Sequence, residues 1–219
     1  MLQAAPHRLF ADLALTCHVI MDTHSGSFGS ILLTHELTRD HDISEDELFR
    51  DALESSSRLM PAELMPLGSL LYELSERSPQ AGSEAGGKDT RHDSPFYVLT
   101  NPLRINGASA LFYPGIMAML SEELSCSYYI LPSSVNELLI LPDNGIPDLE
   151  WLENMVCDVN RMYVDKKDFL SDNVYYYDSH SKQFGLAREL ANADAAASKS
   201  PAGQRAYEGK NQTSSGEMK

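Results

Sequence analysis

Residues 127–141 read Ser-Tyr-Tyr-Ile-Leu-Pro-Ser-Ser-Val-Asn-Glu-Leu-Leu-Ile-Leu, and this stretch decides the fold class. Its two apolar runs, 127–131 and 138–141, are rich in residue types that favour strands, and the residues between them favour a turn. The stretch therefore predicts a β-hairpin. A helix is predicted next, over 148–163, because apolar residues recur there at three- and four-residue steps. This apolar stripe is so broad that we expect the helix to pack on the sheet; its members are Leu149, Leu152, Val156, Val159 and Tyr163, widened by Trp151, Met155 and Met162.

The same order of two strands and a helix is predicted nearer the N-terminus. Short apolar runs over 15–21 and 30–34 predict a first hairpin. Ser44 and, three residues later, Glu47 form the pattern of a capping box, which predicts a helix over 45–59. We therefore predict an α+β fold with mixed or antiparallel sheets, built from two hairpin-plus-helix (ββα) units. The remaining predicted elements are helices over 67–77 and 114–124, a strand over 96–100 and a final hairpin over 174–186.

Composition divides the chain into four parts. Residues 1–77 hold the first hairpin-helix unit, and residues 95–191 hold the second, which we expect to form one globule with the first. Residues 78–94 between them are mostly small and polar, which predicts a mobile connector. Residues 192–219 show no apolar periodicity and predict a disordered tail.

Charge and cysteine content exclude several classes of function. The 219 residues carry a formal net charge of −15, which opposes binding to nucleic-acid phosphates. From residue 186 onward the chain has five basic and four acidic residues, so the excess of acidic residues lies in the part predicted to fold. The N-terminus does not resemble a secretory signal and no apolar run is long enough to span a membrane, so we expect a cytoplasmic protein. No cofactor or metal site is predicted, because the three cysteines, Cys17, Cys126 and Cys157, lack the close spacing of a zinc site.

The turn at 132–137 carries the candidate catalytic residues. Ser133, Ser134, Asn136 and Glu137 place two hydroxyls, an amide and a carboxylate at one end of a hairpin. The alternative is that the serines bond to amides of the turn and Glu137 is a charge at the end of a strand. A serine nucleophile needs a base within hydrogen-bond reach, and here that base would have to be a histidine from elsewhere: His7, His18 or His180.

Several short strings occur in a specific order along the chain, at residues 6–8, 12–14, 29–34, 47–48, 51–52, 130–137, 160 and 170–178. Together they resemble the bacterial family catalogued as domain of unknown function 5688 (DUF5688). The resemblance covers nearly the whole region predicted to fold. It implies no activity, substrate or partner.

The resemblance does imply four candidate binding residues, Asn160, Ser171, Asp172 and Tyr175, which lie in the matching strings. This chain also departs from the pattern of the family, in which the Ser-Ser turn is followed by x-His-Glu. Asn136 stands in the histidine position here, which removes the imidazole that could activate a serine. Members of the family usually carry a further N-terminal region, so we expect this chain to be a short form or a fragment.

The leading functional hypothesis is a non-enzymatic intracellular module that binds another protein through a sheet edge, the Ser-Ser turn or the tail. No nucleic acid and no membrane is expected as a partner. One alternative is a hydrolase-like enzyme using Ser133, Ser134 and Glu137, which requires a histidine or a second carboxylate near the turn. Another is an acidic decoy of a DNA-binding protein, which requires carboxylates spaced along one face like phosphates.

Overall fold

The predicted hairpin of residues 127–141 lies at the centre of a six-stranded antiparallel sheet in the computed structural model, which describes residues 2–22, 28–39, 41, 43–77, 94–145 and 148–198. The strand order is β10-β9-β7-β8-β6-β5, and each neighbouring pair is antiparallel. The α+β class with antiparallel sheets is therefore confirmed. The strands of this sheet are β5 (Glu63–Pro66), β6 (Tyr97–Thr100), β7 (Tyr128–Ser134), β8 (Glu137–Pro142), β9 (Tyr175–Tyr177) and β10 (Phe184–Leu186).

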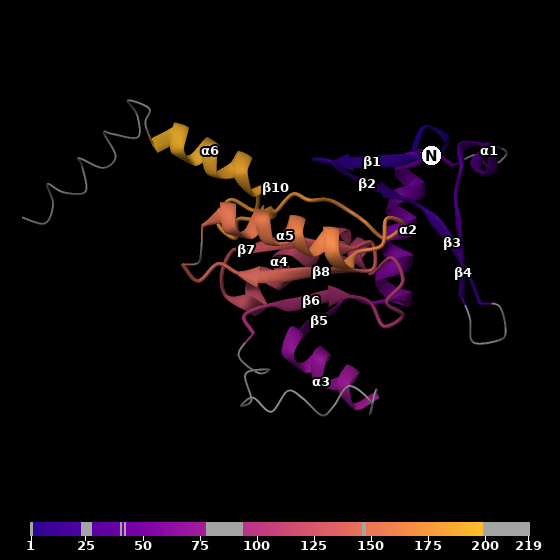
Figure 1. The fold of residues 1–219 in the computed structure, drawn as a ribbon. Helices are drawn as coiled ribbons and strands as arrows, with labels where there is room; N and C mark the ends of the chain where they lie inside the picture. Colours follow the sequence, from indigo (N-terminus) through magenta and orange to yellow (C-terminus); the bar gives the residue numbers. More distant parts are fainter. Residues whose placement is uncertain are drawn as a thin grey trace, which may run out of the picture.

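Two helices cover opposite faces of this sheet (Figure 1). Helix α5 (Leu149–Tyr163) lies on one face and α4 (Ile116–Leu124) on the other. Because side chains of a strand alternate between the two faces, neighbouring residues of β7 join different cores. Ile130 belongs to a buried cluster with Leu120 of α4, whereas Leu131 belongs to one with Leu152 of α5. The sheet is thus buried on both sides at its centre.

The N-terminal segment forms two further hairpins beside this sheet. β1 (His7–Phe10) pairs with β2 (Leu13–Thr16), and β3 (His18–Asp22) pairs with β4 (Phe28–Leu32), each as a separate two-stranded sheet. A short helix α1 (His35–Thr38) and the long helix α2 (Glu45–Leu59) follow. The helix predicted over 45–59 is confirmed together with its capping box, in which Glu47 N donates to Ser44 Oγ at 3.3 Å and Ser44 N donates to Glu47 Oε2 at 3.1 Å.

The two predicted hairpin-plus-helix units differ in how they join the fold, and the structure does not confirm that the fold is built from two such units. The second unit is β7, β8 and α5, which belong to the central sheet and its cover. The first hairpin, β3–β4, stays outside that sheet, and α2 packs through Phe49 against Leu15 and Cys17 instead. The preceding hairpin, β1–β2, was not predicted because its first strand begins with His7 and Arg8 and lacks an apolar run.

The N-terminal half nevertheless contributes one strand to the central sheet. β5 pairs with β6, so strands from both sides of the predicted connector lie side by side, and helix α3 (Leu67–Arg77) follows β5. Sequence reasoning missed β5 because Pro66 ends it; an edge strand tolerates proline since one of its sides makes no ladder hydrogen bonds. Residues 78–93 of the connector lie outside the described residues.

The C-terminal end corrects the predicted start of the tail. Helix α6 (Ala187–Ser198) follows β10 directly and continues past residue 192, where the tail was predicted to begin. Six alanines in this helix supply high helix propensity without an apolar stripe, which explains why periodicity missed it. Residues 199–219 lie outside the described residues. The described residues also include the 3₁₀ segments η1 (Leu2–Ala4) and η4 (Gly107–Phe112). Within the described ranges, none of the helices has both the length and the apolar character needed to cross a membrane.

Candidate functional site

The turn between β7 and β8 is fixed by the loop that follows β6. Thr100 Oγ1 donates to the backbone oxygen of Asn136 at 2.8 Å, and Asn106 N donates to Asn136 Oδ1 at 3.0 Å. Gly107 lies so close that an added Cβ would stand 2.3 Å from the Asn136 oxygen. Asn136, a predicted catalytic candidate, therefore holds the turn against this loop.

The hydrogen bonds found for the other three candidates, Ser133, Ser134 and Glu137, stay within the turn. Ser134 Oγ accepts the Asn136 amide at 3.1 Å, as expected for a serine that satisfies a turn. Ser133 Oγ reaches Glu137 Oε1 at 3.5 Å, which is long for a hydrogen bond to a carboxylate. This contact is too weak to activate a nucleophile.

The histidines that could have served as the base are bonded elsewhere. His7 Nδ1 lies 2.9 Å from the backbone oxygen of Ala5. His18 uses both ring nitrogens, with Nδ1 at 2.8 Å from Ser30 Oγ and Nε2 at 3.2 Å from Thr16 Oγ1. Neither contact leads to the Ser-Ser turn.

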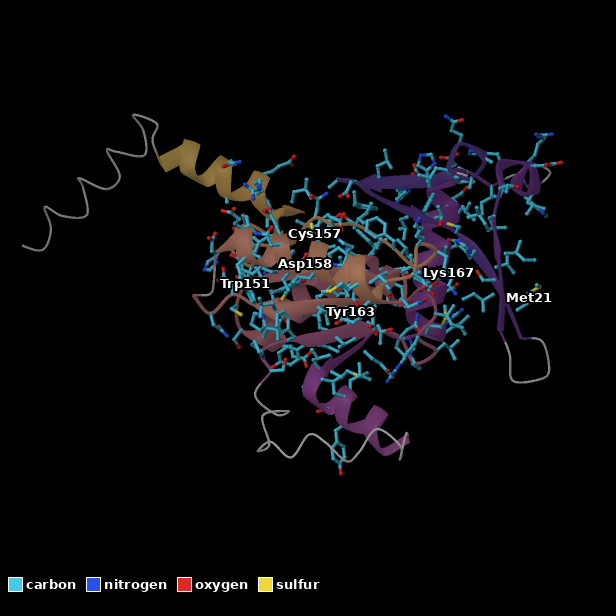
Figure 2. All side chains as sticks on the ribbon, in the orientation of Figure 1. Met21, Trp151, Cys157, Asp158, Tyr163 and Lys167 are labelled. Atoms are coloured by element: carbon cyan, nitrogen blue, oxygen red, sulfur yellow. The ribbon has the colours of Figure 1, made fainter. Side chains whose placement is uncertain are left out.

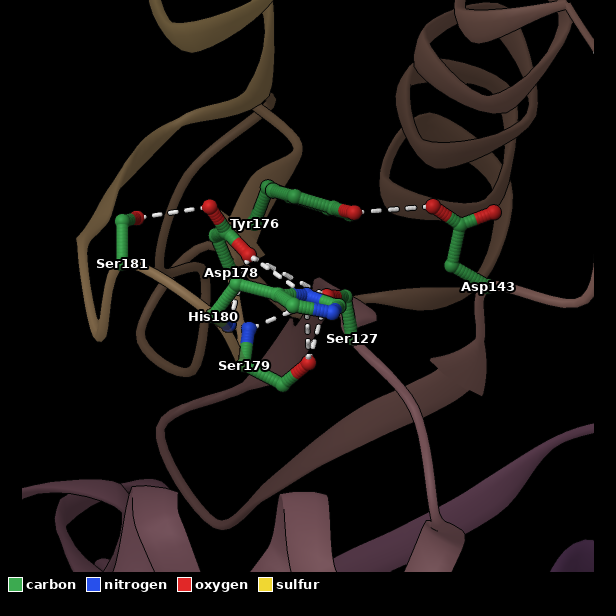
Figure 3. Close-up of polar contacts among 7 residues, drawn as sticks. All are labelled: Ser127, Asp143, Tyr176, Asp178, Ser179, His180 and Ser181. Atoms are coloured by element: carbon green, nitrogen blue, oxygen red, sulfur yellow. Dashed lines mark hydrogen bonds and ion pairs between the residues drawn. The ribbon is translucent and has the colours of Figure 1, made fainter. Parts of the chain in front are cut away.

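The third histidine, His180, lies in a polar cluster at the opposite end of β7 (Figure 3). The seven residues of β7 separate this cluster from the Ser-Ser turn by about 20 Å. His180 Nδ1 lies 3.3 Å from Ser179 Oγ and 3.6 Å from Asp178 Oδ1. A catalytic triad needs the serine and the carboxylate on different ring nitrogens, so this arrangement is not one.

The same cluster joins the ends of three strands. Ser179 N donates to Ser127 Oγ at 3.0 Å, and Ser181 Oγ donates to Asp178 Oδ2 at 2.6 Å. The bond from Ser181, followed by the His180 amide, lowers the pKa of Asp178. Tyr176 OH donates to Asp143 Oδ2 at 2.8 Å, and burial, more than this bond, raises the pKa of Tyr176 to about 12 (Figure 3). The cluster closes the β9–β10 turn onto the start of β7.

The four residues implied by the family resemblance form one network. Asn160 Nδ2, from α5, donates to the backbone oxygen of Ser171 and to Asp172 Oδ1, each at 2.9 Å. Ser171 Oγ in turn donates to Asp12 Oδ2 at 2.7 Å, and the hydroxyl of Tyr175 donates to Asp12 Oδ1. The network therefore brings together Asn160, Ser171, Asp172 and Tyr175 around a residue from the N-terminal hairpin.

Asp12 is the acceptor that sequence reasoning did not single out. It occupies the β1–β2 turn, where Ala11 adopts a φ of 56°. Burial by itself would raise the pKa of Asp12, but the hydrogen bonds from Tyr175, Ser171 and Asn173 outweigh it, so the pKa is lowered. The carboxylate ties the N-terminal hairpin to the segment that follows α5. No short-range sequence signal could reveal this contact, because its partners are about 160 residues apart.

The outer face of α5 is an exposed apolar surface. We define it as Trp151, Met155, Val159, Met162 and Tyr163, which recur at helical spacing beside the buried face. The sequence predicted that this broad stripe packs on the sheet, and for Leu152 and Val156 it does. Trp151, Met162 and Tyr163, however, stay 52%, 63% and 78% exposed. Figure 2 shows Trp151 near one end of α5 and Tyr163 near the other.

This outer face reaches the Ser-Ser turn. Met155 and Val159 line a small apolar recess of about 30 Å³ together with Leu139 of β8 and Ser133. Asp158, which precedes Val159 in the helix, forms an ion pair with Arg161 at 3.9 Å. Ser133 thus borders the apolar outer face of α5.

In the part of the chain that the structure describes, no group of three His, Cys, Asp or Glu side chains is placed to hold a metal ion. A family model described as a family of unknown function (DUF5688) matches residues 1–179, which confirms the resemblance inferred from the short strings. Comparisons with curated proteins and with solved structures found no match.

Proposed function

Because the chain belongs to this family of unknown function, which brings no activity with it, we propose from the structure that it is a non-enzymatic, cytoplasmic protein-interaction module. The contact surface is the outer face of α5. A single observation carries this proposal: Trp151, Met162 and Tyr163 are more than half exposed on one stripe of a well-formed helix. Aromatic residues and methionine are enriched at the centres of protein interfaces.

The partner that would fit the chemistry of this surface is a protein segment with an apolar face and basic flanks. Glu150 lies in the first turn of α5, next to Trp151 in the sequence, and the chain carries a net charge of −15. Opposite charge on the partner would speed the encounter and select against acidic competitors. An amphipathic basic helix laid along α5 satisfies both requirements.

The catalytic alternative has less support. Ser133 and Ser134 bond within their own turn, and the hydrogen bonds of His7, His18 and His180 lie elsewhere. The acidic-decoy alternative stays a prediction, and competition by duplex DNA for the captured partner would distinguish it from the proposal.

Comparative affinity capture tests the proposal. The bait is the full chain, exposed to a lysate of its source organism, and the test variant carries Trp151→Gln, Met162→Gln and Tyr163→Gln. A matched control carries Leu59→Gln, Leu71→Gln and Met119→Gln, because these apolar residues are also exposed but lie on other helices.

Glutamine is a good helix former, so both triple variants should keep their helices. We expect one protein to be recovered with the wild type and with the control, and to be lost with the α5 variant. Recovery of the same proteins with all three baits would contradict the proposed surface. A chain of wild-type sequence that ends at Ser198, the last residue of α6, tests whether residues 199–219 take part.

A further inference from the structure

A cavity of about 350 Å³ lies between the N-terminal segment and the face of the sheet opposite α5. Its walls come from β2, α2, the segment around η4 and the central strands. Apolar side chains dominate these walls, among them Leu15, Phe49, Ala52, Leu111 and Leu138. The outer face of α5 takes no part in it, so this site is separate from the proposed contact surface.

The size of the cavity fits a small organic molecule. Protein interiors are close-packed, so voids much larger than one water molecule are few. An apolar cavity of about 150 Å³ holds a single benzene ring, and binding pockets for small ligands begin at about 300 Å³. A cavity of 350 Å³ therefore has room for a molecule of roughly two fused rings.

One polar group in the wall has no partner. Tyr113 is 5% exposed and lines the cavity, and among the described residues nothing accepts or donates a hydrogen bond at its hydroxyl oxygen. Burial raises the pKa of Tyr113, and the nearby Ser109 hydroxyl offsets this rise only in part. Ser109 Oγ donates its own proton to the backbone oxygen of Asn106 at 2.7 Å, and it forms no hydrogen bond of acceptable geometry with the Tyr113 hydroxyl. Native proteins rarely leave a buried hydroxyl unsatisfied, so the hydroxyl of Tyr113 points to a missing hydrogen-bonding partner.

The other polar groups of the wall are neutral or directed elsewhere. Burial raises the pKa of the Cys17 thiol, and partial burial lowers the pKa of His18, so in both groups the surroundings favour the uncharged form. Lys167 supplies the one formal charge among the lining residues, but its side chain is 77% exposed and its Nζ lies 3.9 Å from Asp168. The cavity thus offers a charged ligand no buried counter-charge.

We propose that this cavity binds an uncharged, largely apolar molecule about the size of two fused rings that carries one hydrogen-bond acceptor, to which the Tyr113 hydroxyl donates. The apolar walls supply the affinity through removal of ligand surface from water. The hydroxyl sets the orientation and favours ligands with a carbonyl or ether oxygen over hydrocarbons of the same shape.

Fluorescence titration of the full chain with the neutral probe 6-propionyl-2-(dimethylamino)naphthalene tests the proposal. This probe has a naphthalene body and a carbonyl oxygen, and its emission moves to shorter wavelength in an apolar site. The wild type should give a saturable change with one site per chain. Ala52→Phe, which fills the cavity, should weaken binding at least ten-fold, whereas Ala191→Phe on exposed α6 should leave it unchanged.

Two further variants test the assigned hydrogen bond and the location of the bound probe. Tyr113→Phe should weaken probe binding about five-fold, the equivalent of one hydrogen bond, and should leave the binding of naphthalene unchanged. The variant with Trp151→Gln, Met162→Gln and Tyr163→Gln should bind the probe as the wild type does, because the exposed face of α5 lies outside the cavity.

The absence of saturable binding to the wild type would overturn the proposal, and so would equal binding by the wild type and Ala52→Phe. If Ala52→Phe fails to fold, Tyr113→Phe decides: an equal loss of probe and naphthalene binding, or no loss of either, contradicts the assigned hydrogen bond.

Discussion

Replacing Tyr113 by Phe should raise the free energy of unfolding of the ligand-free protein, although Tyr113 lies in the core. A buried hydroxyl without a hydrogen-bond partner costs about 1–3 kcal/mol, and Phe removes that cost. Removing the oxygen leaves a small void, which takes back part of the gain. We therefore expect a net stabilisation of about 1 kcal/mol, which for a domain of this size raises Tm by about 2–4 °C.

Tyr128→Phe is the matched control. Tyr128 is also buried in the same core, but its hydroxyl donates to the backbone oxygen of Met117 at 3.1 Å. Its removal should cost about 1 kcal/mol, because the Met117 oxygen loses its partner. Urea denaturation of both variants and the wild type, with equal slopes, gives the two changes. Equal losses of stability in Tyr113→Phe and Tyr128→Phe would show that the Tyr113 hydroxyl is bonded, and would refute the reasoning.

Three other predictions concern the turn, the N-terminal hairpin and the buried tyrosines. Gly107→Ala should destabilise the fold by about 2–3 kcal/mol in urea denaturation, because its Cβ would stand 2.3 Å from the Asn136 oxygen. The control Gly29→Ala, whose added Cβ would have its nearest neighbour at 3.9 Å, should change the stability little. A mild effect of Gly107→Ala would contradict the close approach. Asp12→Ala should lower the free energy of unfolding by about 1 kcal/mol at pH 7, after allowance for solvent screening. Because folding lowers the pKa of Asp12, this loss should shrink as the pH falls below about 4. A loss of stability that does not depend on pH would point to another cause. The pKa of Tyr176 is raised to about 12, so its contribution to stability should be present below pH 10 and be lost as the pH rises toward 12. The difference in absorbance at 295 nm between the wild type and Tyr176→Phe should show this ionisation only well above pH 10, and a midpoint at pH 10 in the folded state would contradict the burial of Tyr176.

Local signals in the sequence were enough to predict much of the fold. The capping box of Ser44 and Glu47 gave the start of α2, and the apolar runs on either side of the Ser-Ser turn gave β7 and β8. Such signals depend on residues that are close in sequence. The same local rules missed β5, which ends at Pro66, and α6, whose alanines form no stripe.

The candidate site was harder to predict because its contacts join distant segments. Ser134 was expected to satisfy an amide of its own turn, and it does. The bond from the Asn106 amide to Asn136 and the acceptor role of Asp12 depend on how the sheet and the hairpins pack. The exposed part of α5 could be identified only from the structure, because periodicity gives the width of an apolar stripe but not how much of it a neighbouring element covers.

The most direct test of the proposed interaction surface is the affinity of the captured partner for the purified chain, measured by titration calorimetry. We expect the variant with Trp151→Gln, Met162→Gln and Tyr163→Gln to bind about 100-fold more weakly than the wild type, since large residues at the centre of an interface contribute about 1 kcal/mol or more each. The control with Leu59→Gln, Leu71→Gln and Met119→Gln should bind within about two-fold of the wild type. Equal affinities for the wild type and the α5 variant would contradict the proposal that this protein binds its partner through the outer face of α5.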